Sequence, residues 1–411
     1  MTWWMRIDQF LNTRRMTYAW IAGCVLWSAW LLSVLLGPGN MDLAGQVIGT
    51  DYLQFYSAGV AVRTGQSAYL YNFAIESQLE QSIAGPGLTS FHAFVTPPFL
   101  AWLYAPLSLL PYSWSFILWS LLSLVFLWLS IRLLAVDRPH KSLLWSLTWF
   151  PIFAAISFGQ NSLLSLLLFS LTYWLWRKEK YVAAGLVSSL ILFKPQLILG
   201  IGVLLLLEWR KSWKSLAGLA IGGGILAGSC FLFLPEASRA YVELARNFIP
   251  RMLYLDQFPL WHLHSIRGFW ILLFPGQRWL VEGLTLVFSA AGIVAFIIFW
   301  RSWRENKKLL FAGAICLTVL ITPHDMIYDW SILLIPAAIF WQELANQKPL
   351  WKVLFSSIWL VTFLSGPLTY LQLKALPIAF QISIPVYCFV LFTIYQSLVR
   401  KPANHVELVE R

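Results

Sequence analysis

The chain has 411 residues, of which 59% are apolar and 11% are charged, and its mean hydropathy is +0.69. Soluble domains carry about 25% charged residues, so the composition excludes a soluble globular protein. The apolar runs are continuous and Leu-rich, which excludes a membrane β-barrel of alternating segments. We therefore predict an all-α polytopic membrane protein that forms one domain over 1–411.

The first span, over 16–36, is longer than the apolar part of a signal peptide and is predicted to be a membrane helix. Further spans follow along the chain, which makes about twelve crossings in all. They are 112–134, 142–158, 160–176, 182–193, 197–207, 216–233, 279–299, 309–322, 328–341, 351–365 and 380–397.

Basic residues gather between the spans, and the positive-inside rule places each cluster, together with both termini, in the cytoplasm. The net charge of +11 is then explained by orientation in the membrane, and no nucleic-acid partner is needed to account for it. The clusters are Arg6/Arg14/Arg15, Arg132/Arg138/Lys141, Arg177/Lys178/Lys180, Arg210/Lys211/Lys214, Arg301/Arg304/Lys307/Lys308, Lys348/Lys352 and Arg400/Lys401.

Two large loops, 38–95 and 234–278, are predicted on the extracytoplasmic side. Segments 96–111 and 268–276 are apolar, but they are short and bounded by prolines. If both crossed the membrane, the basic clusters between Arg132 and Lys214 would face outward. We therefore interpret these two segments as re-entrant or interfacial pieces on the outer side.

The first outer loop carries an acid close to the end of the first span. The pattern predicts an amphipathic helix over Tyr52–Arg63 that is broken at Gly65, followed by a second helix over 68–81. Asp51 precedes the first of these helices, where its carboxylate is equally explained by N-capping. Among aromatic and amide neighbours, a carboxylate also fits a sugar site, in which it accepts a hydroxyl proton. These neighbours are Tyr52, Gln54 and Tyr56.

Three more polar groups are predicted on the same side. Gln160 and Asn161 lie in a tight turn between two spans, where their amides either bind a ligand or cap the backbone. Lys194 interrupts an apolar stretch, and it either pairs with an anion or extends to the headgroups. The third group lies in TPHDMIYD, where helix capping is the alternative to a binding role; it comprises His324, Tyr328 and Asp329.

The second outer loop contains His262 and His264, and we place His264 among the candidate binding residues. A His-x-His pair can bind metal, but neither an HExxH motif nor a carboxylate cluster accompanies it. We therefore predict no metal site and no cofactor.

The order of these motifs resembles the GT-C superfamily of membrane glycosyltransferases and, within it, glycosyltransferase family 87. The segments that carry the resemblance are TDYLQFYSAGVAVRTGQSAYLYN, TPPFLAWLYAPLSLLPY, FGQNSLLSLLLF, AGLVSSLILFKPQLIL and TPHDMIYDWSILLIP. The resemblance implies a GT-C-like helical bundle in a bacterial plasma membrane, with the active site on the extracytoplasmic face. It also implies a polyprenyl-phosphate-linked sugar as donor and a glycolipid or glycan as acceptor.

Carried over to this chain, the family's catalytic base is Asp51, and Lys194, His324, Tyr328 and Asp329 bind the carrier phosphate and the sugar. Mannose is the default donor sugar, although the sequence TPHDMIYD differs from the corresponding segment of the actinobacterial mannosyltransferases. A transporter or flippase of lipid-linked sugars is the main alternative, since polar residues at broken helices suit both classes. No internal repeat supports a transporter. A structural subunit requires both Asp51 and Lys194 to be incidental.

Overall fold

The computed structural model describes residues 11, 13–255, 258–343 and 348–399, and helices dominate this part of the chain. Within the described residues β-structure is limited to two isolated bridges, Met41 with Val47 and Leu263 with Met326. Arg6, Arg400 and Lys401, which belong to two of the predicted inner clusters, lie outside the described residues.

Five helices are long and apolar enough to cross a membrane. They are α2 (Thr13–Leu36), α6 (Tyr112–Leu133), α12 (Trp209–Phe233), α15 (Arg278–Trp303) and α18 (Lys348–Ala375). The protein is thus an all-α membrane protein, as predicted. The span predicted over 351–365 is shorter than α18, which continues through Pro367 to Ala375.

The other predicted spans form shorter helices, several of them in two pieces. One span is divided into α7 (Pro139–Leu147) and α8 (Phe150–Ser157), because Pro151 starts a new helix in its first turn. The rest are α9 (Ser162–Arg177), α10 (Tyr181–Ser189), η3 (Leu190–Phe193), η4 (Pro195–Ile198), α11 (Leu199–Leu207), α16 (Lys307–Ile321), η7 (Ile327–Leu333), α17 (Leu334–Glu343) and α19 (Ser383–Val399). A total of twelve crossings stays a prediction.

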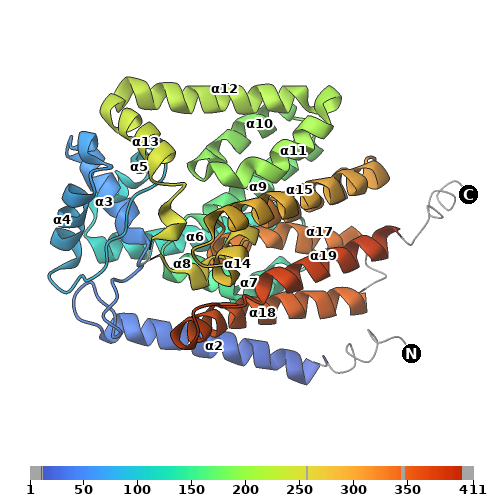
Figure 1. Ribbon diagram of the computed structural model, residues 1–411, viewed down its shortest axis with the longest axis horizontal. Coiled ribbons are helices and arrows are strands. Elements are labelled where there is room, and N and C mark those ends of the chain that lie inside the picture. The colour runs from blue at the N-terminus through green and yellow to red at the C-terminus, as the bar shows by residue number, and fades with distance from the viewer. Residues whose placement is uncertain (1–10, 12, 256–257, 344–347, 400–411) are drawn as a thin grey trace, which may run out of the picture.

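Segments predicted to face the cytoplasm meet at one end of the bundle. Lys307, at the start of α16, donates to Glu179 after α9, with Nζ 2.8 Å from Oε1. Lys308 pairs with Glu343 at the end of α17, and Gln342 donates to the carbonyl of Leu134 after α6. Figure 1 shows α3 and α4 at the opposite end. The two-sided arrangement agrees with the one derived from charge.

The first outer loop folds into α3 (Tyr52–Arg63), η1 (Ser67–Tyr69) and α4 (Phe73–Ala84). Helix α3 has the predicted bounds, but most of its residues are buried. The solvent-exposed face expected of an amphipathic helix is therefore nearly absent. The reason is that α4, α5 (Phe99–Tyr104) and η2 (Leu107–Leu109) cover it. Helix α4 begins five residues later than predicted, at the cap of Asn72.

The second outer loop contains α13 (Pro235–Asn247), η5 (Met252–Tyr254), η6 (Leu260–His262) and α14 (Ile266–Leu273). It contacts the first loop through aromatic pairs, with ring centroids of Tyr71 and Tyr241 5.7 Å apart. Helices α5 and α14 have six and eight residues, which gives lengths of about 9 and 12 Å. Neither helix is long enough to cross a bilayer of about 30 Å, in agreement with the interpretation as interfacial or re-entrant pieces.

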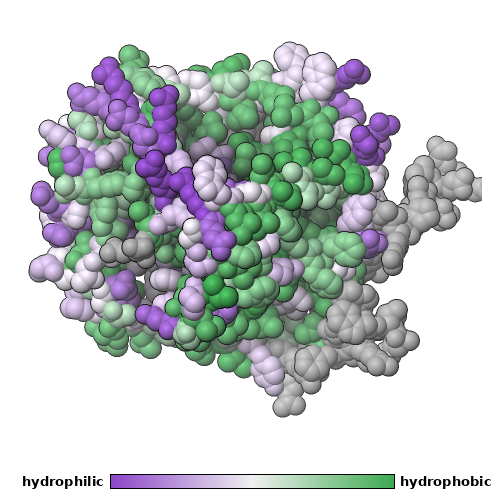
Figure 2. Space-filling view, viewed as in Figure 1, coloured by the Kyte–Doolittle hydropathy of each residue, from purple (hydrophilic) through white to green (hydrophobic). Residues whose placement is uncertain are grey.

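The surface is apolar between the two ends of the bundle. Figure 2 shows hydrophobic side chains over the middle of this face, with hydrophilic ones over the segment that includes α13 and at the opposite end. Large exposed apolar residues on α15 include Leu286, Val287 and Phe288. Such a continuous apolar surface is expected where lipid is the solvent.

Candidate active site

The predicted polar groups meet where helices are interrupted, at positions that the charge pattern predicts on the outer side. Gly159, between α8 and α9, has a φ of +66°, and a Cβ built on it would lie 2.5 Å from the Cβ of Tyr52. The missing side chain lets the start of α3 approach this turn, so that the amide of Tyr52 donates to the carbonyl of Phe158 at 3.0 Å. This close packing places Asp51 beside Gln160.

Asp51 has no capping role in the structure. It occupies the N-cap position of α3, but its side chain accepts no hydrogen bond from the helix backbone. Instead its Oδ2 accepts a bond of 2.8 Å from Nε2 of Gln160. The side chain of Asp51 is 24% exposed, so Asp51 is bonded to the protein at Oδ2 and remains partly accessible.

Lys194 lies between η3 and η4, where Pro195 keeps the residue before it out of the helical conformation. Its ammonium is buried and therefore does not extend to the headgroups. Its Nζ donates to Oδ1 of Asp329 at 2.6 Å. The other two bonds, each of 3.3 Å, reach Oε1 of Gln160 and Oγ of Ser162. The anion partner predicted for Lys194 is thus Asp329 of the same chain.

The segment after α16 completes the network. Oδ1 of Asp329 also accepts a bond of 2.6 Å from Ser162. The ring of Tyr328 lies under the Lys194 ammonium at 4.9 Å, and its hydroxyl accepts from Nε2 of Gln160 at 3.1 Å. Gln160 therefore connects the buried Lys194–Asp329 pair to the partly exposed Asp51.

Some polar side chains at this level have no partner within the described structure. These are the side-chain amide of Asn161, at both Nδ2 and Oδ1, and the carboxylate of Asp325, at both oxygens; all four atoms are buried without a hydrogen bond. His324 is partly exposed, and its ring interacts with the charges of Asp329, Lys194 and Arg267.

The side chains of four predicted binding residues make no hydrogen bond to this network in the described structure. Tyr52 is fully buried, with its hydroxyl 2.6 Å from that of Ser115, and Tyr56 donates to the carbonyl of Leu110. Both rings belong to the aromatic core, so neither is free to stack on a sugar. Gln54 is partly exposed, and its side-chain amide makes no hydrogen bond in the described structure. His264 is buried and is 2.7 Å from the hydroxyl of Ser383.

Two residues that the sequence did not single out reach the site, and so does His262, which the sequence indicated only as a possible metal ligand. Ser162 bonds to both members of the buried ion pair, and Nδ1 of His92 is 3.9 Å from Oδ1 of Asp51. His262, and not His264, interacts with the charge of Asp51, and burial lowers the pKa of its imidazole. A polar residue directly after the Gly159 turn was a signal for Ser162; the sequence around His92 offered none.

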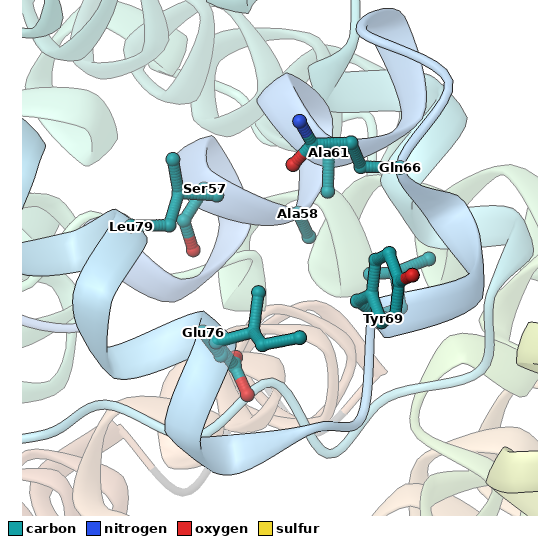
Figure 3. Close-up of a pocket in the computed structure, with 9 residues that line it drawn as sticks. Ser57, Ala58, Ala61, Gln66, Tyr69, Glu76 and Leu79 are labelled. Carbon is teal, nitrogen blue, oxygen red and sulfur yellow. The ribbon is translucent and has the colours of Figure 1, made fainter.

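A separate pocket lies between α3 and α4, as Figure 3 shows. It encloses about 290 Å³ of empty space, part of it open to solvent, and its lining includes Ser57, Gln66, Tyr69 and Glu76. Neither Asp51 nor Lys194 contributes to this lining. The pocket is therefore distinct from the network around Asp51.

Residues 94–323 match the model of glycosyltransferase family 87. This segment covers more than half of the chain. The chain belongs to glycosyltransferase family 87. Gln160 and Lys194 lie inside the matched segment, whereas Asp51 and Asp329 lie outside it. No curated protein and no solved structure matches the chain.

Membership in family 87 makes the protein a glycosyltransferase, which uses a sugar donor and an acceptor. It agrees with the resemblance found in the sequence, and no observation supports a transporter. In the part of the chain that the structure describes, no three His, Cys, Asp or Glu side chains gather as a metal site. Independence from metal stays a prediction.

Proposed function

We propose that this family 87 enzyme transfers a hexose, with mannose as the default, from a polyprenyl-phosphate carrier to a glycolipid or glycan. Transfer takes place on the extracytoplasmic face of the plasma membrane, with inversion at the anomeric carbon. The observation that carries the proposal is the position of Asp51. Its partly exposed carboxylate is hydrogen-bonded to Gln160, which is itself bonded to a buried ion pair.

Asp51 is the general base of the proposed reaction. Gln160 occupies Oδ2, which leaves Oδ1 to accept the proton of the acceptor hydroxyl. The acceptor oxygen then attacks the anomeric carbon, and the bond from that carbon to the phosphate oxygen breaks. Because the carboxylate is fixed before substrate binds, little reorganisation is needed in the transition state.

Lys194 supplies positive charge for the departing phosphate in this proposal. All three of its donors are occupied in the present structure, so carrier binding requires the phosphate to replace at least one partner. The weaker bonds, to Gln160 and Ser162 at 3.3 Å each, are the ones we expect to exchange. His324 and Tyr328 are adjacent to Lys194 and are proposed to contact the sugar or the phosphate.

A transfer assay with defined donors tests the proposed function. We expect protein in nanodiscs to move a labelled hexose from polyprenyl phosphate to a lipid acceptor fraction and to release free polyprenyl phosphate in equal amount. The same hexose on a nucleotide should not be used. Translocation of the intact sugar lipid across vesicles without release of polyprenyl phosphate would support the transporter alternative and contradict the proposal.

The proposed sidedness is testable by cysteine labelling in a variant without native cysteines. Lys194 is buried, so exposed positions at the two ends of the bundle are better probes. We expect Ser82→Cys and Ser90→Cys to react with a membrane-impermeant maleimide from outside intact cells. Lys178→Cys and Arg304→Cys should react only after permeabilisation. The reverse pattern would place the Asp51 network in the cytoplasm.

A further inference from the structure

A histidine of the first outer loop lies beside Asp51, although the loop that carries it has no regular structure. Nδ1 of His92 is 3.9 Å from Oδ1 of Asp51, and its Nε2 is 2.9 Å from the hydroxyl of Ser90. The imidazole is 14% exposed, so it is largely enclosed between these two groups. Oδ1 is also the carboxylate oxygen that Gln160 leaves free.

Two glutamates of α4 hold the backbone on which His92 is carried. Glu80 accepts a bond of 3.0 Å from the amide of His92, and Glu76 accepts a bond of 2.6 Å from the amide of Phe94. Burial raises the pKa of Glu80 to about 8 and that of Glu76 to about 9. The neutral form of both is therefore favoured at pH 7, which limits the negative charge that they add near Asp51.

We propose that His92 is a positioning residue for Asp51, and that Glu80 and Glu76 in turn position His92. With Ser90 donating to Nε2, the neutral imidazole carries its hydrogen on Nδ1, which faces Oδ1 of Asp51. Burial also lowers the pKa of His92, which favours this neutral form. Catalytic hydrogen bonds are often long before substrate binds, so the 3.9 Å separation is expected to shorten in the reactive complex.

The carboxylate is then held from two sides, by Gln160 at Oδ2 and by His92 at Oδ1. This inference rests on the proposed role of Asp51 as base. It adds that Oδ1 of Asp51, the reactive oxygen, is oriented by His92, which lies 41 positions later in the sequence. The other titratable groups that interact with Asp51 in the described structure are His262, Tyr328 and Tyr112, and all three stay unchanged in the variants below.

Substitution of His92 is expected to lower turnover without affecting donor binding. We expect His92→Ala to reduce kcat by about 10- to 100-fold with KM unchanged, since a small misplacement of the base has effects of this size. Because this bond is expected to form in the reactive complex, a carboxylate that loses its donor there is protonated more easily, so the acid limb of the kcat profile should move to higher pH. His92→Asn keeps an N–H near the position of Nδ1 and should restore both values.

Variants of α4 and a distant histidine complete the test. Glu80→Gln retains an oxygen that can accept from the His92 amide and should behave as wild type, whereas Glu80→Ala should reproduce the pH shift of His92→Ala. His140→Ala, at an exposed histidine that packs on Trp128, is the matched control and should be neutral. Loss of activity in His92→Ala without a pH shift, or without rescue by Asn, would reduce His92 to a packing residue. In that case an inactive Asp51→Asn would still support the proposed function.

Discussion

Asp51→Asn is expected to reduce sugar transfer by about 100-fold or more, because an amide cannot accept the proton of the acceptor hydroxyl. Asparagine retains the size of the side chain and an oxygen that can accept from Gln160, so the fold and carrier binding should persist. The measurement is single-turnover transfer in nanodiscs with saturating polyprenyl-phosphate sugar, together with the affinity for the carrier.

Asp42→Asn is the matched control, since Asp42 lies in the same outer loop and bonds only to local backbone. Its Oδ1 accepts from the amides of Ala44 and Gln46, each at 2.9 Å, and an asparagine oxygen can accept the same bonds. We expect wild-type transfer from this variant. Wild-type rates in Asp51→Asn as well would show that the carboxylate is not the base.

Lys194→Met is expected to weaken carrier binding and to abolish most turnover. The change also leaves Asp329 buried without its cation, and breaking a buried pair from one side costs about 3–5 kcal/mol of stability. A loss of activity in this variant alone therefore does not separate phosphate binding from folding.

The double variant Lys194→Met/Asp329→Asn separates the two roles. It removes both charges, so the melting temperature should recover toward that of wild type, while carrier binding and transfer should stay low. Recovery of transfer together with stability would mean that Lys194 serves only to neutralise Asp329. Lys307→Met is a suitable control, because Lys307 forms an ion pair at the opposite end of the bundle, where it is partly exposed.

Local features that depend on neighbouring residues were predictable from the sequence. The bounds of α3 followed from Asp51 before it and Gly65 after it, and the breaks at Gly159 and Lys194 followed from glycine and proline. The basic clusters separated the two ends of the bundle. Those patterns were enough to place Asp51, Gln160, Lys194 and Asp329 on one side.

The direction of individual side chains was not predictable in the same way. Tyr52 and Tyr56 are on a helix that other segments cover on several sides, so a face that looked free in the sequence is buried. Lys194 was expected to pair with an anion, but the sequence does not show which distant residue lies beside it. Its partner, Asp329, is 135 positions away. His92 is placed by backbone bonds to Glu76 and Glu80. Glu76 and Glu80 are spaced i, i+4 on α4, but this spacing does not indicate a contact with the His92 segment without the fold.

The buried pair of Lys194 and Asp329 has a consequence for the biogenesis of the protein. Ribosomes add roughly 5–20 residues per second, so Asp329 is synthesised about 7 to 27 seconds after Lys194. During that interval the segment around Lys194 has to enter the membrane with an unmatched ammonium, which costs about 3 kcal/mol at the centre of a helix. The leucine-rich turns on either side, in η3 and α11, supply the compensating hydrophobicity. Insertion and assembly are therefore separate events for this part of the chain, and the charge is neutralised only in the second.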